Sequence, residues 1–335
     1  MTQRWRRLVT GLQTRETGEA VALFRIAMAV TILLSWVPPM LDDVVGLMWL
    51  DEAHGGYRTL KGPWLVQALG GPTPGVVRGL IAGSICSAAL MGLGVGGPVL
   101  ARLISFFCLH ATMAVVDINS HCGGAYDELI SNGLWLLTLA GPSPTLSLRT
   151  WWRTGAWTSD ETVPWWPRLL VMWQLVLMYW ATGLQKVSTH WVPGGDLMAL
   201  YYILQQPTWQ WIDMAWVAPY AALTQVGTAV SWWWEVTCPV WLWAWWSSRL
   251  ETPRVGAAGW LARAHVRTVY ALVGVSFHLL VLVTMNVGPF SMASLAYYAV
   301  VVHPREWRAL GARLTRAWRR GVLREETPAQ APASH

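Results

Sequence analysis

Long apolar stretches separated by short polar segments fill most of this 335-residue chain, and they constrain its fold more than any other feature. A helix needs about 17–25 mainly apolar residues to cross the hydrocarbon core of a bilayer. Eight stretches approach or exceed this length, at residues 20–40, 76–95, 99–118, 126–142, 167–186, 216–247, 268–287 and 289–303. The pattern predicts an all-α integral membrane protein with about eight transmembrane helices. Nine helices are the alternative, because the sixth stretch is long enough to divide in two near Pro219.

The composition agrees with a membrane protein. Charged residues make up 13% of the chain and hydrophobic residues 54%, whereas ordinary soluble domains carry about 25% charged residues. The chain is rich in Trp, with 26 residues, and many lie near the ends of apolar stretches, where aromatic rings favour the boundary between bilayer and water. The four Cys residues lack the spacing of a metal site, so we expect neither a metal nor a disulfide framework.

The cationic residues are unequally distributed among the connecting segments. They concentrate in residues 4–15, 149–168, 249–267 and 305–324. Because cytoplasmic loops carry an excess of Lys and Arg, an even number of spans places all four segments and both termini in the cytoplasm. We therefore expect a multi-pass protein of the plasma (inner) membrane. The net charge of +6 follows from this topology, so the expected partner is the lipid bilayer and not nucleic acid.

The same pattern divides the chain into four parts. Residues 1–19 are the basic cytoplasmic N-terminus, 20–303 the transmembrane domain, 304–326 a basic amphipathic cytoplasmic helix, and 327–335 a disordered tail. Within 304–326, the apolar residues Trp307, Leu310, Leu314 and Trp318 share one face opposite the arginines. Such a helix is typical of one that lies on an anionic membrane surface.

Lys186 is the first candidate for chemistry, because it ends the apolar stretch 169–186 on the expected outer side. A lysine at the edge of a membrane core loses its proton more cheaply than one in water, and a neutral amine is a base. The alternative is an ordinary lysine whose long stem reaches the interface. Tyr179 and Thr182 precede Lys186 by seven and four residues, which predicts a polar stripe that faces other helices.

His121 is the second candidate. It follows Asn119 and Ser120 in the short link between the third and fourth stretches, at the same expected membrane level as Lys186. A histidine there is suited to stabilise a developing anion or to pass a proton. A solvated loop histidine is the alternative.

Two further ionisable residues fall inside apolar stretches. His278 lies mid-span, where a buried neutral histidine with a hydrogen-bond partner is as consistent as a functional one. Glu235 shares a helix face with three hydroxyl residues, and its pairing with Arg25, Arg102 or a histidine is as consistent as catalysis. The hydroxyl residues are Thr224, Thr228 and Ser231.

Four segments, taken in order, resemble the HTTM family, whose best-known members are the vitamin K-dependent gamma-carboxylases. Together they span roughly residues 20–307. The segments are Leu23-Phe24-Arg25-Ile26, Asn119-Ser120-His121, the stretch from Tyr179 to Trp191, and the run from Phe277-His278 through Gly288-Pro289-Phe290-Ser291 to Pro304.

The resemblance implies that Lys186 is a catalytic base and His121 its partner. In the carboxylases, a free lysine amine deprotonates reduced vitamin K, and O2 converts the quinol into a strong base on the way to the epoxide. That base removes a γ-proton from a substrate glutamate, and CO2 adds. By resemblance, the cofactors are reduced vitamin K or menaquinol with O2 and CO2. Tyr179 and Trp191 would wall the cavity, with Asn119, His278 and Glu235 as supporting residues.

The chain also departs from the carboxylases. They continue into a large lumenal region that grips the substrate, whereas here little sequence follows residue 303, and residues 187–190 lack their acidic residues. Short bacterial relatives include the SdpB-like proteins, which help to mature a secreted peptide toxin. We expect quinol-epoxidising or carboxylase-like activity, or peptide modification, at an outward-facing Lys/His site. The alternatives are a non-catalytic maturation or accessory factor for a secreted peptide or small partner protein, and a small-solute transporter.

Overall fold

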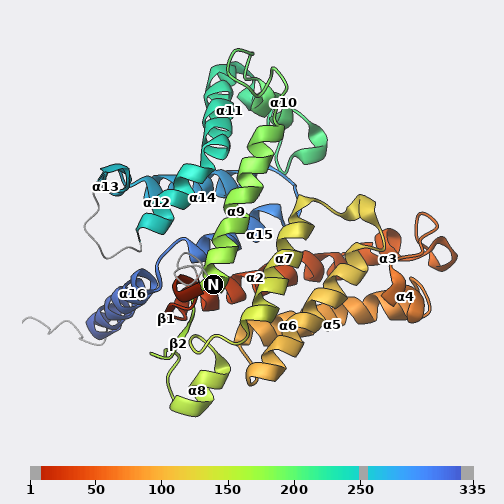
Figure 1. The fold of residues 1–335 in the computed structure, drawn as a ribbon. Helices are drawn as coiled ribbons and strands as arrows, with labels where there is room; N and C mark the ends of the chain where they lie inside the picture. The colour runs from red at the N-terminus through yellow and green to blue at the C-terminus, as the bar shows by residue number, and fades with distance from the viewer. Residues whose placement is uncertain (1–8, 249–255, 326–335) are drawn as a thin grey trace, which may run out of the picture.

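The computed structural model describes residues 9–248 and 256–325, with side chains described as far as residue 318, and its architecture is mainly helical (Figure 1). The expected disordered tail, residues 327–335, lies outside the described residues, as do Arg4, Arg6, Arg7, Arg249 and Arg254. The prediction of a helical fold is confirmed. One small departure from all-α is an antiparallel ribbon of β1 (Arg15–Thr17) and β2 (Thr162–Pro164), which pairs Glu16 with Val163.

Four of the described helices are long and apolar enough to cross a membrane. They correspond to the first, second, third and seventh apolar stretches. Their bounds are α2 (Glu19–Leu41), α5 (Pro74–Leu93), α6 (Pro98–Val116) and α14 (Val266–Thr284). α5 and α6 each begin with a proline in the first turn, where the missing N–H costs no hydrogen bond.

The other four stretches also form helices, but these are shorter, broken or interrupted by polar and aromatic residues. The fourth is α7 (Ala125–Ala140), the fifth α9 (Trp166–Gln185), and the eighth α15 (Phe290–Tyr297) with η5 (Tyr298–Val300). The sixth begins with a 3-10 turn, η4 (Ala215–Tyr220), which contains Pro219. It then divides into α11 (Ala221–Val236) and α12 (Cys238–Ser247), because Pro239 in the first turn of α12 cannot continue the hydrogen bonding of α11.

The helices form two groups that meet at α15. In the first, α2 packs against α5, α7 and α15, and α6 packs against α5 and α7. In the second, α9 packs against α11 and α12, while α14 packs against α12 and α15. α9 also contacts α7, so it connects the two groups, and Figure 1 shows it reaching from the centre of the molecule toward α10 (Ala199–Leu204) and α11.

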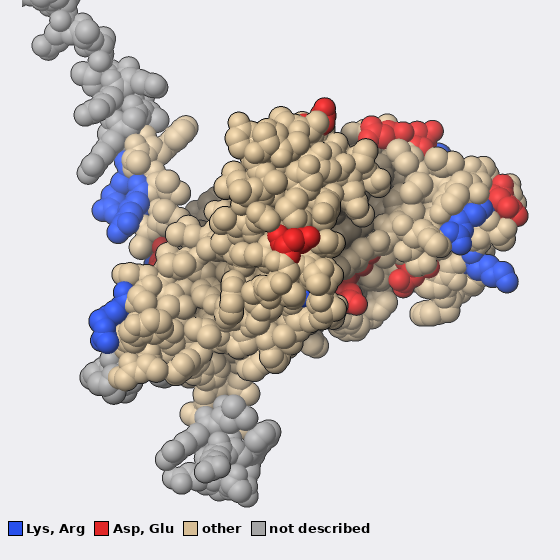
Figure 2. Space-filling model, turned by 90° about the horizontal axis from the view of Figure 1, so that it is seen from above, with Lys and Arg blue, Asp and Glu red and all other residues tan. Residues whose placement is uncertain are grey.

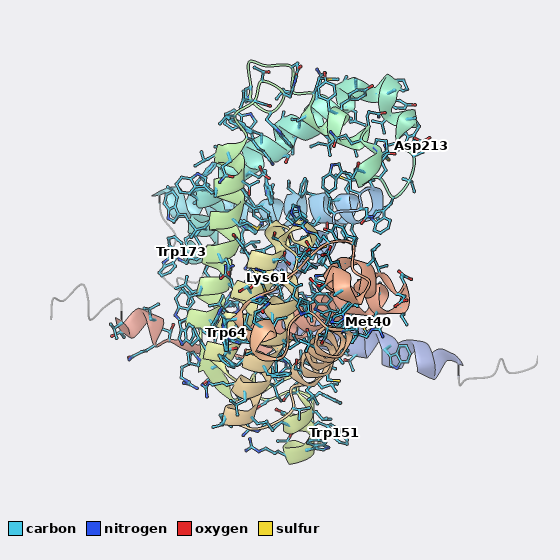
Figure 3. All side chains as sticks on the ribbon, turned by 90° about the vertical axis from the view of Figure 1, so that its right-hand side faces the viewer. Met40, Lys61, Trp64, Trp151, Trp173 and Asp213 are labelled. Carbon is cyan, nitrogen blue, oxygen red and sulfur yellow. The ribbon has the colours of Figure 1, made fainter. Side chains whose placement is uncertain are left out.

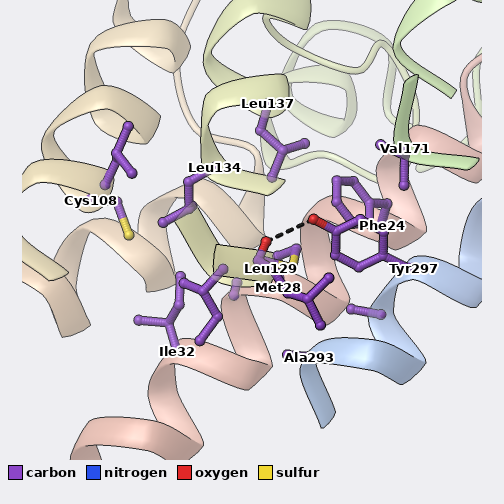
Figure 4. Packing of buried hydrophobic residues seen from close by; sticks show 14 of the residues in the cluster. Phe24, Met28, Ile32, Cys108, Leu129, Leu134, Leu137, Val171, Ala293 and Tyr297 are labelled. Atoms are coloured by element: carbon purple, nitrogen blue, oxygen red, sulfur yellow. Dashed lines mark hydrogen bonds between the residues drawn. The ribbon is translucent and has the colours of Figure 1, made fainter. Parts of the chain in front are cut away.

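The core lies where α2, α7 and α15 meet (Figure 4). Phe24, Met28 and Ile32 follow one another at helical spacing on α2 and are at most 1% exposed. The Tyr297 hydroxyl donates to the Leu129 carbonyl at 2.7 Å, which satisfies a polar group inside this apolar cluster. Burial of large apolar side chains by helices from both ends of the chain therefore fixes the frame that carries the site.

The remaining helices are short connectors, apart from the last. They are α3 (Val44–Trp49), α4 (Trp64–Ala68), α8 (Leu148–Thr154), α13 (Gly256–Arg263), and the 3-10 turns η1 (Glu52–His54), η2 (Ser120–Cys122) and η3 (Pro207–Trp209). α16 (Pro304–Glu325) agrees with the helix predicted over 304–326. Arg308 holds α16 to the body through ion pairs with Glu19 and Asp160.

Apolar side chains cover much of the surface. On α6, Leu103 and Phe107 are 57% and 52% exposed, and on α14, Leu272 and Val283 are 61% and 65% exposed. In the face drawn in Figure 2, most of the surface is uncharged and the Lys and Arg side chains lie at its margins. Trp151, in α8, and Asp213, before η4, lie near opposite ends of the molecule in Figure 3. An apolar exterior on long helices is what contact with lipid requires.

Candidate functional site

Lys186 lies at the C-terminal end of α9 and contacts α11. Its ammonium group donates a hydrogen bond to Glu235 Oε2, and the two side chains are 15% and 4% exposed. The ammonium also lies 4.3 Å from the centroid of the Trp191 ring, a cation–π distance. The lysine therefore has a carboxylate and an aromatic face as its neighbours.

Gly183 is the reason that α9 and α11 approach so closely beside this pair. A Cβ atom at position 183 would lie 2.8 Å from Glu235 Cβ and 3.0 Å from the Val236 nitrogen. Small residues permit such close approach between helices, because only backbone and hydrogen occupy the contact. The glycine therefore sets the distance between Lys186 and Glu235.

Buried hydroxyl residues continue from Glu235 along α11, as the sequence predicts. Thr224, Thr228 and Ser231 are all buried on the same face as Glu235. The partner of Glu235 is Lys186, and none of the ion pairs among the described residues joins it to Arg25, Arg102 or a histidine. The sequence did not predict the Lys186–Glu235 pair, because the pair depends on the contact between α9 and α11 beside Gly183.

Tyr179 lies seven residues before Lys186 and joins a second, fully buried group. Its hydroxyl is 2.6 Å from His278 Nε2 and 3.2 Å from the Tyr298 hydroxyl. Tyr179 is 2% exposed and His278 is not exposed at all. His278 is therefore a buried histidine with a hydrogen-bond partner, the non-functional alternative given for it above. Its Nδ1 has no partner within residues 9–248 and 256–318.

The predicted polar stripe on α9 is correct for Tyr179 and wrong for Thr182. Thr182 is exposed, and its hydroxyl donates to the Met178 carbonyl of its own helix. The reason is the position of the contact with α11, which centres on Gly183 and leaves residue 182 on the flank. The buried stripe of α9 thus runs through Tyr179, Gly183 and Lys186.

His121 lies in η2, between α6 and α7, and Asn119 is the residue just before η2. Asn119 is 1% exposed; its amide donates to the Met48 carbonyl of α3 at 2.7 Å and to the Tyr57 hydroxyl at 3.2 Å, so it ties this link to α3 and to the segment that follows α3. His121 is exposed. No hydrogen bond or ion pair of the described residues joins His121 to Lys186, so their functional pairing stays a prediction.

The loop after Lys186 contains a hydrogen bond between a histidine and an aspartate that the sequence did not reveal. His190 Nδ1 lies 2.8 Å from Asp196 Oδ1, and the two side chains are 46% and 45% exposed. The hydrogen bond from His190, together with one from the Met198 amide, lowers the pKa of the Asp196 carboxyl. The turn at Gly194 and Gly195 brings the two residues together, because Gly194 has a φ of +96° that other residues rarely adopt.

A further buried pair holds β1 to α9. Arg168 donates to Glu16 through Nε at 2.7 Å and Nη2 at 2.8 Å, and the two side chains are 1% and 8% exposed. The guanidinium also lies 4.9 Å from the Trp245 ring centroid and donates to the Val300 carbonyl. In the sequence Arg168 stands out only as one of the arginines of 149–168, because its partner Glu16 is 152 residues away.

No protein-family model, curated protein or solved structure matches this chain. The fold and the site together define a helical protein with at least four helices suited to a bilayer and a Lys–Glu pair at the end of one long helix.

Proposed function

We propose that the protein is a multi-pass plasma (inner) membrane protein of the HTTM family, with eight spans and both termini in the cytoplasm. The arrangement in Figure 1 supports this topology: α13 and α16 lie at the left of the view and α8 at the bottom, whereas α3 and α4 lie at the right and α10 at the top. The first group belongs to the arginine-rich segments and the second to the segments with few cations. A broken sixth span, divided at Thr237, keeps both of its pieces within one crossing.

We infer that the Lys186–Glu235 pair is the acid–base centre of an outward-facing site. The observation that carries this proposal is the contact of the Lys186 ammonium with both Glu235 and Trp191 at the edge of an apolar helix. Transfer of one proton from the ammonium to the carboxylate leaves a free amine and a carboxylic acid, and shielding from water lowers the cost of this neutral pair. The free amine then accepts the proton of an acidic hydroxyl, which leaves an oxyanion beside the regenerated ammonium.

The surroundings of the pair suit a membrane-dissolved quinol such as reduced vitamin K or menaquinol. Leu184 and Val187 flank it and are 52% and 79% exposed, so an isoprenoid tail in the bilayer meets apolar side chains. Trp191 offers a ring face to an aromatic headgroup. A reduced quinol with O2 would supply the strong base of epoxide and carboxylation chemistry, with CO2 as the second reactant in the carboxylase case. The chain's own part is to bind the headgroup and to move its proton through Lys186.

His121 is proposed as the second residue of this site, at the outer end of α6. Its exposure leaves its ring accessible to a substrate peptide that lies on the outer surface. Asn119 supports it, because the Asn119 side-chain oxygen accepts a hydrogen bond from the His121 amide at 3.2 Å. In this proposal Lys186 acts on the quinol and His121 contacts the peptide.

The second candidate function is a non-catalytic maturation or accessory factor for a secreted peptide, as in the SdpB-like proteins. The observation that favours it is the ion pair itself, because a lysine paired with a carboxylate anchors α9 to α11 without any chemistry. In this case the charge of Lys186 is essential and its ability to lose a proton is not.

Substitution of Lys186 distinguishes the two functions. Quinone epoxide formed from menaquinol and O2 by the purified protein is measured by mass spectrometry for Lys186→Ala, Lys186→Arg and the surface control Lys61→Arg. The enzyme proposal expects both Lys186 variants to lose activity by at least about 100-fold, because arginine keeps the ion pair but does not give up its proton. Full peptide-maturation activity of Lys186→Arg in cells, with no epoxide from the unmodified protein, supports the accessory role and rejects the enzyme.

A further inference from the structure

Arg25 is a buried cation in α2 whose charge has no carboxylate partner among the described residues. The residue is 5% exposed. Its Nη2 donates to the Leu146 carbonyl at 2.5 Å and lies 3.4 Å from the Gly92 carbonyl. The other two nitrogens, Nε and Nη1, are shielded from solvent and have no hydrogen-bond partner in the described part of the chain. An unpaired donor of a buried charge is costly, so a group that accepts from it is to be expected.

A small cavity lies against the guanidinium. Its volume is about 20 Å³, and its walls come from α2, α5, α6 and α7 and the segments that follow α5 and α7. The lining residues include Arg25, Met91, Gly94, Ser105, Leu137 and Gly141. Gly94 makes room for the guanidinium, because a Cβ atom at that position would lie 2.6 Å from Arg25 Nη1.

The cavity is large enough for only one water-sized ligand. About 10–15 Å³ of such volume holds one water molecule, so 20 Å³ accepts a water or a monatomic anion and excludes phosphate, carboxylates and lipid headgroups. The choice between water and anion depends on charge. Water satisfies hydrogen bonds but leaves the positive charge uncompensated in a largely apolar site.

The charges around the cavity favour an anion. Arg102, on α6, lies against Gly141 at the cavity wall, since a Cβ atom at Gly141 would be 2.9 Å from Arg102 Cζ. Arg102 is itself exposed and does not line the cavity, so the uncompensated buried charge is that of Arg25, which no ion pair of residues 9–248 and 256–318 engages. The carbonyl ends of α5 and α7 stabilise the Arg25 cation in part, but its Nε and Nη1 donors still have no acceptor in the described part of the chain.

We propose that Arg25 and this cavity bind one chloride-sized monovalent anion. The anion accepts hydrogen bonds from Nε and Nη1 and compensates the buried charge where α2, α5, α6 and α7 meet. It is a structural ligand of the first helix group, separate from the Lys186–Glu235 site.

Thermal unfolding of the purified full chain in detergent tests the proposal. We expect a saturable rise of roughly 5 °C in the midpoint when sodium gluconate is replaced by sodium chloride at equal ionic strength, because gluconate is too large to enter. Arg25→Gln abolishes this difference, whereas Arg78→Gln, at an exposed arginine of α5, preserves it. Equal midpoints in the two salts for the unmodified protein overturn the proposal.

A direct measurement on the unmodified protein covers the case in which Arg25→Gln does not fold. Crystals grown in bromide give an anomalous difference peak beside Arg25 Nε and Nη1 if the anion is present. An ordered water at that position, with no anomalous peak, overturns the proposal.

Discussion

Lys186 at the end of α9 and Glu235 on α11 neutralise each other across a helix contact centred on Gly183. The contact is short because residue 183 has no side chain, and both charges are largely shielded from water. Any base chemistry at Lys186 therefore begins with the transfer of its proton to Glu235. The carboxylate, which the sequence offered only as a secondary candidate, is the nearest charged group to the lysine.

Removal of Glu235 alone is expected to destabilise the protein strongly. Glu235→Leu leaves the Lys186 ammonium without its counter-charge, and loss of one member of a shielded pair costs about 3–5 kcal/mol. The double variant Glu235→Leu/Lys186→Met removes both charges and recovers most of that loss. The measurement is the midpoint of thermal unfolding in detergent for both single variants and the double variant. Additive effects of the single changes would show that the two residues are not coupled.

Substitution of Gly183 tests the close approach of α9 and α11. Gly183→Ala places a methyl group against Glu235 Cβ and the Val236 backbone, so the helices must separate at a cost of about 1–3 kcal/mol. Gly79→Ala on α5 is the matched control, because nothing lies within 4 Å of its added methyl group. There the better helix propensity of alanine is expected to be neutral or stabilising by up to about 1 kcal/mol. Similar unfolding midpoints for the two variants would contradict the packing described here.

The Arg168–Glu16 pair should contribute far more to stability than the surface pair Arg78–Asp43. Arg168→Gln leaves Glu16 charged and shielded, with an expected loss of about 3–5 kcal/mol, while Arg78→Gln costs at most about 1 kcal/mol. The side chains of the first pair are 1% and 8% exposed, and those of the second 54% and 86%. Unfolding midpoints at low and high salt provide the comparison. The Arg78 effect, if any, fades with salt and the Arg168 effect persists.

Tyr179→Phe removes the hydroxyl that bonds to buried His278 and leaves Nε2 without that partner. The expected loss of stability is about 1–3 kcal/mol, the cost of an unsatisfied polar group in the interior. Tyr298→Phe is the control; it deletes only the 3.2 Å contact with Tyr179 and leaves the bond to His278 intact. A larger effect at Tyr298 than at Tyr179 would show that His278 does not depend on Tyr179.

The loop after Lys186 should become less protected at low pH. The hydrogen bonds to Asp196 lower its pKa below the ordinary value of 3.8, so the stabilisation they provide is complete above that value. It is lost as the pH falls through the lower pKa of the folded loop. Hydrogen exchange of the Met198 amide, which donates to Asp196, reports this change relative to Asp196→Asn. The two proteins are expected to differ above pH 4 and to converge as Asp196 is protonated; a constant difference at all pH values would contradict the assignment.

The helical fold was predictable because hydrophobicity is a local property of the chain. The long apolar stretches at 20–40, 76–95, 99–118 and 268–287 indicated α2, α5, α6 and α14 with nearly the bounds observed. The sixth stretch was expected to divide near Pro219, but its helical part divides at Thr237. Pro219 lies in η4, before α11 begins, whereas Pro239 in the first turn of α12 interrupts the hydrogen bonding of α11. The short ribbon of β1 and β2 was missed because its strands are far apart in sequence and only three residues long.

The candidate residues were also recognisable as types, but their partners were not. An intramembrane Lys, Glu or His is rare enough in an apolar stretch to stand out without any structure. Which side chain neutralises it depends on the rotation of one helix against another. Gly183 fixes that rotation for Lys186 and Glu235, and the loop after α7 fixes it for Arg25 through the Leu146 carbonyl.

The sequence by itself determined that the chain forms apolar helices, the approximate bounds of the four longest apolar ones, and which ionisable groups the helices carry, since each depends on residues a few positions apart. Tertiary structure decided that Lys186 meets Glu235, that Tyr179 meets His278, and that Arg25 lines a small cavity and meets no carboxylate among the described residues. These outcomes depend on distances between helices, and such distances are set by the packing of side chains that lie tens to hundreds of residues apart.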